Sequence, residues 1–467
     1  MTRSGGAPLV LAAGAYAGAL AASAPAWPDD WDGVGFVESI EGFDMGRFRP
    51  HAPGYPVYVA MLRVAHVAAR SPMGACVLVA LASGVVAATF VWCAGRRLAG
   101  DRAAAAATAL VAIAPASWKA CSGVGSEAPA LACAAACAWA LVASRDGRRG
   151  AAESLGVGAG LGLGVRLSWT PLYVAALLLA PRAVRRRALL VGAGALAAWA
   201  IPFVAIVGPE RLVNLYRAQW IGHASRWGGT AATVPGLARA VWFARDVVVD
   251  GLGAGRDALG LAIASLGVAS FGFALRERRW IGPSGRRAAA VAVGPYAIWV
   301  ALGQNVRDEP RHALPIVVAL AAALGLAAGR SRPATAIAVA LAGCMALRTV
   351  RDAYDRRTIP PPGVQLVASV RAEAGSDRPL VFGTRSVRFF ETTELAARAF
   401  PAESFGDVEM ALTRVNSPPS RVWITSEVEG LVAARRTFAR VATLCRPPRI
   451  DRRRPCLDVY EWRVDER

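Results

Sequence analysis

The sequence predicts an all-α polytopic membrane protein that ends in a small α/β domain. Of its 467 residues, 55% are hydrophobic, and the mean hydropathy of +0.38 is higher than soluble domains usually show. Apolar runs of about 16 to 22 residues recur, as bilayer-spanning helices require. After Arg351 the composition changes to short β-like runs. We therefore expect a membrane module over residues 1–350 and an α/β domain over residues 351–467.

Arg3 is the only charged side chain before the first apolar run, Ala7 to Ala24, and the run shows no convincing cleavage site. We interpret it as an uncleaved signal-anchor helix, and the alternative is a signal peptide. Ten further apolar runs bring the expected spans to about eleven. The spans are expected near 7–24, 73–94, 103–117, 127–143, 151–166, 168–180, 188–207, 257–275, 288–303, 312–328 and 333–348.

Five short basic loops orient these spans, because Arg and Lys accumulate in cytoplasmic loops. The loops are 94–102, 144–150, 181–187, 276–287 and 329–333. The N-terminus is then inside and the C-terminal domain outside. The same bias accounts for the net charge of +20, so a nucleic-acid partner is not expected.

The apolar segment 55–70 is not counted as a span. Arg63, His66 and Arg70 recur in it at helical spacing, which is typical of a helix lying in the membrane interface. Counting it as a span would reverse the side of every later loop and place the five basic loops outside.

The first outer loop, 25–72, concentrates carboxylates. Asp29, Asp30 and Asp32 follow the first span among aromatic residues that include Trp31. Ionisable side chains at the membrane edge need a functional or structural reason. Glu127 stands at the outer end of another span, where capping of a helix that begins after Ser126 is the alternative to a functional role.

These motifs, in this order, resemble those of the membrane glycosyltransferases of the GT-C fold, which use polyprenyl-phosphate sugars. "WDGVGF" followed by "HAPGYPVYV" is similar to the "WDSGEF…HPPGYPLY" pattern of one bacterial branch. "GSEAPA" looks like the second acidic loop of that branch. "EPRHALPIVVALAAALG" resembles a helix common in the protein-mannosyltransferase and aminoarabinose-transferase relatives. The resemblance covers residue 1 to about residue 350.

The resemblance implies an inverting hexosyl or pentosyl transferase of the bacterial cytoplasmic membrane. Its donor would be a polyprenyl-phosphate-linked sugar, and its acceptor a glycan, a lipid or a protein on the outer face. A carboxylate would take the acceptor's proton. Asp32 is followed by Gly33-Val34-Gly35 where the family often has a second acid. This departure leaves Asp30 and Asp32 both open as the base, with Glu127 as a third catalytic candidate.

The departing lipid phosphate is an anion, and Arg suits phosphate best among the cationic side chains. The candidates for donor phosphate binding are Arg311, Arg166, Arg307 and Lys119. For each Arg the alternative is a side chain that merely reaches to the membrane interface. The residues expected near the substrate are His51, Trp31 and His312.

The C-terminal domain contains four β-like runs, at 379–384, 421–428, 441–446 and 456–463. Cys445 and Cys456 flank a basic, Pro-rich turn between the last two runs. In an oxidising periplasm they are expected to form a disulfide, and the alternative is two unpaired thiols.

Two other functions stay open at this point: a transporter or lipid flippase, and a non-catalytic envelope scaffold. A transporter normally carries ionisable residues at mid-membrane and shows repeated broken helices. The sequence shows neither clearly. It has no His cluster, and a carboxylate pair could hold a divalent metal ion or act without one. No cofactor is therefore assigned.

Overall fold

The structure is a computed structural model of the chain. It describes residues 6–226, 229–276, 283–307, 309–329, 331–373, 378–391, 393–414, 421–431, 438–451 and 455–463. Arg3 and part of the basic loop 276–287 lie outside these ranges. The chain divides into two compact units. The helical unit comprises Met1–Ala24 and Ser39–Tyr354, and the sheet unit comprises Pro25–Glu38 and Asp355–Arg467.

This division differs from the single boundary expected at residue 350. The boundary near the end of the helical unit shifts by one helical turn, to Tyr354. Residues Pro25–Glu38, expected in the membrane module, group with the C-terminal residues instead. The reason is a set of long-range ion pairs described below, which local sequence patterns do not reveal.

The helical unit contains α-helices of very different lengths. They are α1 (Gly6–Ser23), α3 (Pro56–Ala69), α4 (Pro72–Ala99), α5 (Asp101–Ile113), α6 (Pro115–Ser122), α7 (Glu127–Arg145), α8 (Ala151–Val165), α9 (Thr170–Leu179), α10 (Arg182–Val207), α11 (Pro209–Ile221), α12 (Leu237–Arg245), α13 (Ala258–Arg276), α14 (Pro283–Gly303), α15 (Pro310–Ala328) and α16 (Arg332–Thr358). The last turn of α16 belongs to the sheet unit.

Every expected span coincides with a helix, but not every helix is long enough to be a span by itself. The span expected at 103–117 is broken into α5 and α6, which bend by 66°. Pro115 begins α6, and a proline interrupts the hydrogen-bond ladder of a continuous helix. Within the described residues, five helices are long and apolar enough to cross a membrane, or six if α5 and α6 form one span. The count of eleven stays a prediction.

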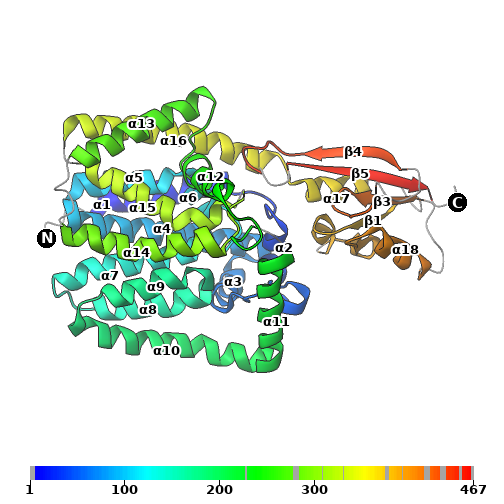
Figure 1. Cartoon of the computed structure of the whole chain (residues 1–467), viewed down its shortest axis with the longest axis horizontal. Coiled ribbons are helices and arrows are strands. Elements are labelled where there is room, and N and C mark those ends of the chain that lie inside the picture. Colours follow the sequence, from blue (N-terminus) through cyan, green and yellow to red (C-terminus); the bar gives the residue numbers. More distant parts are fainter. Residues whose placement is uncertain are drawn as a thin grey trace. The chain divides into compact units, whose positions relative to one another are not determined.

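The helices of the helical unit pack in a row, in the order α15, α5, α4, α7, α8, α10 (Figure 1). Small residues allow the closest approach. A Cβ placed on Gly156 of α8 would lie 2.4 Å from the carbonyl oxygen of Ala188 on α10. Close backbone contact of this kind is how helices associate in membranes, where water supplies no hydrophobic drive.

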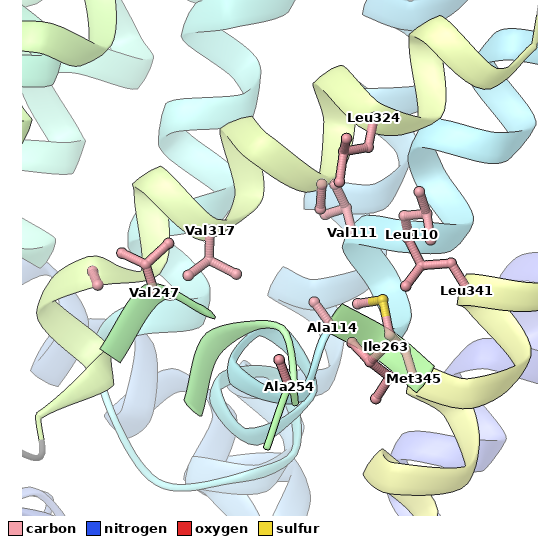
Figure 2. Packing of buried hydrophobic residues seen from close by; sticks show 12 residues of the cluster. Leu110, Val111, Ala114, Val247, Ala254, Ile263, Val317, Leu324, Leu341 and Met345 are labelled. Carbon is pink, nitrogen blue, oxygen red and sulfur yellow. The ribbon is translucent and has the colours of Figure 1, made fainter. Parts of the chain in front are cut away.

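Larger apolar side chains fill the other side of the row. Figure 2 shows Leu110 and Val111 of α5 packed near Val317 of α15 and Met345 of α16. These side chains are almost fully buried. The cluster joins helices that are distant in sequence, and it holds α5, α15 and α16 together.

The sheet unit contains a five-stranded mixed sheet. Its strands are β1 (Leu380–Gly383), β2 (Ala399–Pro401), β3 (Arg421–Thr425), β4 (Ala439–Cys445) and β5 (Cys456–Arg463), in the order β2-β1-β3-β5-β4. The first three strands in this order are parallel, and β3, β5 and β4 pair antiparallel. All four β-like runs of the sequence form strands. The sequence does not predict β2, which is only three residues long.

Both faces of this sheet are covered. Leu380 and Phe382 of β1 pack with α18 (Phe405–Thr413) on one face. Val381, between them, packs on the other face with α17 (Pro362–Ala372) and with the 3-10 helix η7 (Ser386–Phe390). This alternation follows the period-2 geometry of a strand. At the end of the sheet, Cys445 and Cys456 are paired residues of β4 and β5 and form a disulfide.

Candidate functional site

A buried ion pair in the helical unit joins the start of α7 to the end of α8. Arg166 Nη1 donates to Glu127 Oε1 at 2.8 Å and to Ser126 Oγ at 2.9 Å. Arg166 is the C-cap residue that directly follows α8, and Glu127 lies in the first turn of α7. A carboxylate is favourable there because the N-terminus of a helix carries positive partial charge.

Arg166 is only 5% exposed, and its Nε–H finds no hydrogen-bond partner in the described part of the chain. The same is true of the indole N–H of Trp169, one turn further along the chain and fully buried. Buried donors are nearly always satisfied, so an exception needs an explanation. An anionic ligand beside Arg166 would provide one, since guanidinium binds phosphate through several N–H groups.

Aromatic side chains from other helices surround this pair. The hydroxyl of Tyr58 on α3 accepts from the backbone N–H of Gly125 at 3.1 Å. Burial raises the pKa of Tyr58 well above its ordinary value, because desolvation disfavours the phenolate. The ring of Tyr296 on α14 lies edge-on to Trp169 at 6.2 Å, and its hydroxyl donates to the carbonyl oxygen of His312 at 2.8 Å.

Arg311 of α15 lies within electrostatic range of Arg166. It forms an ion pair with Glu309 at 2.9 Å. Like charges repel, and Glu127 and Glu309, each paired with one of these guanidinium groups, compensate them. The structure thus brings together Arg166, Arg311 and Glu127, three of the residues singled out in the sequence.

The other donor-phosphate candidates have different surroundings. The guanidinium of Arg307 lies over the ring of Trp242 at 5.2 Å, a cation–π contact. Lys119 is exposed on α6. His51 is hydrogen-bonded to the hydroxyl of Tyr55 at 2.9 Å, and Tyr55 in turn interacts electrostatically with Arg166.

The acids of the first loop belong to the sheet unit and start the short helix α2 (Trp31–Glu38). Asp30 Oδ1 accepts from the backbone N–H of Gly33 at 2.8 Å. This is the hydrogen bond of a helix N-cap, so Asp30 has a structural role. Asp32 lies in the first turn of α2 and is 6% exposed. Helix capping therefore accounts for Asp30, one of the two acids that the sequence leaves open as the catalytic base.

Ion pairs tie α2 and the residues before it to the C-terminal part of the chain. Asp29 accepts from Arg356 Nε at 3.0 Å and from Arg446 Nη1 at 2.9 Å. At the other end of α2, Arg388 Nη2 donates to Glu38 Oε2 at 2.9 Å.

The sequence reasoning missed these partners. Acids in a first loop and arginines more than 300 positions later give no local signal of pairing. Only the chemical logic that a buried charge needs a partner could have suggested that they meet.

The sequence left open a divalent metal ion bound by a carboxylate pair, and it assigned none. Among the described residues, no group of three His, Cys, Asp or Glu side chains is arranged to hold one. The carboxylates of Glu127 and Glu309 each pair with an arginine.

Comparison with known proteins relates the chain to membrane glycosyltransferases. The family model for dolichyl-phosphate-mannose-protein mannosyltransferases matches residues 51–207, about a third of the chain. The matched region includes Glu127 and Arg166, and it begins after Asp32. No protein of curated function is significantly similar to the chain in sequence.

Several solved structures are similar along most of the chain. ArnT from Cupriavidus metallidurans in the apo state has a TM-score of 0.60 and 15% identity, over 98% of this chain and 98% of that chain. Its complex with undecaprenyl phosphate has a TM-score of 0.59 and 14% identity, over 99% and 98%. The apo oligosaccharyltransferase of Archaeoglobus fulgidus has a TM-score of 0.54 and 14% identity, over 91% and 70%.

At these identities the similarity establishes the fold. The expected GT-C-like fold is thus confirmed: a mostly helical unit with apolar helices long enough to cross a membrane, and a small C-terminal sheet.

Proposed function

We propose that this chain is a membrane glycosyltransferase that moves a sugar from a polyprenyl-phosphate donor to an acceptor outside the cytoplasm. The fold supports this, because a structure similar over nearly the whole chain is described as bound to undecaprenyl phosphate. The observation that carries the proposal is the buried Arg166, held by Glu127 and still presenting an unsatisfied N–H.

Arg166 binds the donor phosphate, and Arg311 supplies a second positive charge. Glu127 and Ser126 fix the guanidinium of Arg166 before the donor arrives. Such preorganisation is effective because the site need not rearrange as charge develops on the leaving oxygen. His51 is hydrogen-bonded to Tyr55, and the carbonyl oxygen of His312 accepts from Tyr296. These bonds connect both histidines to the residues around Arg166.

Asp32 acts as the general base. The acceptor oxygen or nitrogen forms a bond to the anomeric carbon, while the bond from that carbon to the phosphate oxygen breaks. The lipid phosphate leaves with the electron pair, and Asp32 takes the acceptor's proton. Attack from the face opposite the phosphate inverts the anomeric configuration. The leaving phosphate is a stable anion, so no strong general acid is required.

In the proposed membrane topology the chain has eleven spans, with the N-terminus in the cytoplasm and the sheet unit in the periplasm. The helix α3 lies in the outer interface, with Arg63 and Arg70 towards anionic head groups. The acceptor is a glycan, a lipid or a protein, and the membrane is the bacterial cytoplasmic membrane. A disulfide between Cys445 and Cys456 fits an oxidising compartment.

Transfer in proteoliposomes tests the function. The wild-type protein should release polyprenyl phosphate from a polyprenyl-phosphate sugar and glycosylate the acceptor. The Asp32→Asn protein should lose ~10²-fold or more of this rate, because a positioned base contributes about 10²–10⁴-fold. Transport of the intact lipid-linked sugar across the bilayer, with no release of lipid phosphate by the wild type, would show a flippase instead.

A further inference from the structure

The parallel part of the sheet has a distinctive edge at the carboxyl ends of β1 and β3. The chain leaves β1 through Arg385 into η7, on the face that α17 covers, and it reaches β3 through α18 on the opposite face.

Here this edge holds a segment of the same chain. The guanidinium of Arg385 lies over the ring of Trp31 at 5.2 Å. One turn later, Arg388 pairs with Glu38 at 2.9 Å, and both side chains are buried. Trp31 and Glu38 are the first and last residues of α2. The helix that carries Asp32 is therefore held at both ends by residues that follow β1.

The turn that presents Arg385 is itself fixed. Glu427, just after β3, accepts through Oε2 from the backbone N–H groups of Arg385 at 3.0 Å and Ser386 at 2.9 Å. It also accepts from the hydroxyl of Ser386 at 2.7 Å. The turn that contacts α2 is thus held to the end of β3 by three hydrogen bonds.

The chain just before α2 is held from a second direction. Arg446 donates to Asp29, to the carbonyl oxygen of Ile359 at 3.0 Å and to that of Arg356 at 3.0 Å. All three of its nitrogen atoms are used, and it is almost fully buried. Arg446 directly follows Cys445, whose disulfide to Cys456 closes the loop that contains it.

We infer that the sheet unit is a clamp that positions α2 for catalysis, with Arg388 and Arg446 as positioning residues at its two ends. This inference rests on the proposed role of Asp32 as the base. An eight-residue helix such as α2 is too short to be stable by itself. Its carboxylate can be placed accurately only by tertiary contacts, and a misplacement of about 1 Å costs up to ~10²-fold in rate.

The test compares the buried pair with an exposed pair of the same unit. Arg388→Gln and Glu38→Gln remove the clamp contact singly, and the double variant removes both charges. The control is Arg371→Gln, because Arg371 pairs with Glu394 at 2.8 Å on the surface. The measurements are kcat, the affinity for the donor, and hydrogen exchange of the peptide that contains residues 29–38.

The two single variants should lower kcat ~10-fold or more by displacing the base. Their affinity for the donor should stay within about twofold of wild type, because Arg166 is unaffected, whereas a general folding defect would lower both. The amides of α2 should exchange about tenfold faster. The double variant should be no worse than either single variant, because the two residues act as a unit. Arg371→Gln should match the wild type in every measurement.

Three results would overturn the inference. If Arg388→Gln leaves kcat and α2 exchange unchanged while Asp32→Asn abolishes transfer, the clamp is wrong and the proposed function stands. If the variants change only the KM for the acceptor, the sheet unit binds acceptor and does not position the base. If the wild type shows no transfer at all, the proposed function is wrong. Hydrogen exchange then tests the clamp by itself. Unchanged protection of the α2 amides in Arg388→Gln would show that Arg388 does not hold α2. Should Arg388→Gln not fold, Arg388→Lys keeps the charge and shortens the reach.

Discussion

Arg446 donates a hydrogen bond of 2.9 Å to Asp29, which lies 417 positions earlier in the chain. Arg356 donates to the other oxygen of the same carboxylate. Both arginines are almost fully buried. One carboxylate therefore compensates two buried cations. Moving Asp29 away from the two arginines would separate buried opposite charges, which costs free energy.

Substitutions at this triad should differ in their cost. Asp29→Asn removes the carboxylate that two buried arginines share and should destabilise the sheet unit by about 3–5 kcal/mol. Arg446→Gln leaves Asp29 paired with Arg356 and should cost less. Hydrogen exchange of β4 and β5 amides in the full-length protein gives the free energy of opening. Glu394→Gln, at an exposed pair, is the control and should leave the stability nearly unchanged, because solvent screens the pair. A larger loss for Arg446→Gln than for Asp29→Asn would contradict this account.

The contact between α8 and α10 should tolerate no side chain at Gly156. A Cβ there would lie 2.4 Å from the carbonyl oxygen of Ala188, so Gly156→Val must separate the helices. We expect a lower yield of folded protein and a lower temperature of aggregation in detergent. Gly194→Val on α10 is the matched control, because nothing lies within 4 Å of its Cβ. Equal behaviour of the two variants would show that α8 and α10 do not pack in this way.

Much of the fold is predictable from the sequence because it depends on local patterns. Apolar runs mark the helices, and short β-like runs mark four of the five strands. The break between α5 and α6 is signalled only by Pro115, which the continuous apolar composition obscures. The strand β2 is three residues long and exists because β1 pairs with it.

The candidate site is predictable to a smaller degree. Glu127, Arg166 and Arg311 stand out as charges at the ends of apolar runs, and the structure brings them together. Asp30 and Asp32 look equivalent in sequence, and only the hydrogen bond to Gly33 assigns one of them to capping. The partners of Asp29 and Glu38 depend on tertiary folding, which no local pattern encodes.

The proposed topology predicts on which side of the membrane each loop lies. A reporter active only in the periplasm should be active when fused after Gly208 or Arg351, and silent after Arg97 or Arg148. The reason is the excess of Arg in the short loops that contain the last two positions. Activity after Arg97 together with silence after Gly208 would mean that α3 crosses the membrane and reverses the sides.

Arg166 should be the main ligand of the donor phosphate. Arg166→Lys keeps one positive charge. The lysine cannot donate hydrogen bonds to Glu127, Ser126 and a phosphate at the same time, because an ammonium lacks the planar fork of a guanidinium. Binding of polyprenyl phosphate, measured by native mass spectrometry or with labelled lipid, should weaken ~10-fold or more. Arg307→Lys is the control and should stay within about twofold, since Arg307 stacks on Trp242. Weakened binding in the control variant alone would move the phosphate site to Arg307.

The two acids at the start of α2 should separate into a cap and a base. Asp30→Ser keeps a side-chain oxygen for the N–H of Gly33 and should retain transfer within about threefold, whereas Asp30→Ala should cost α2 about 1 kcal/mol of stability. Asp32→Asn keeps the shape of the side chain but should lower kcat by about 10²–10⁴-fold. Stability from hydrogen exchange of α2, measured beside kcat, distinguishes the two roles, because loss of a cap changes exchange first and loss of a base changes only the rate. Full activity in Asp32→Asn with an inactive Asp30→Ser protein would make Asp30 the base, and full activity in both would leave α2 without a catalytic role.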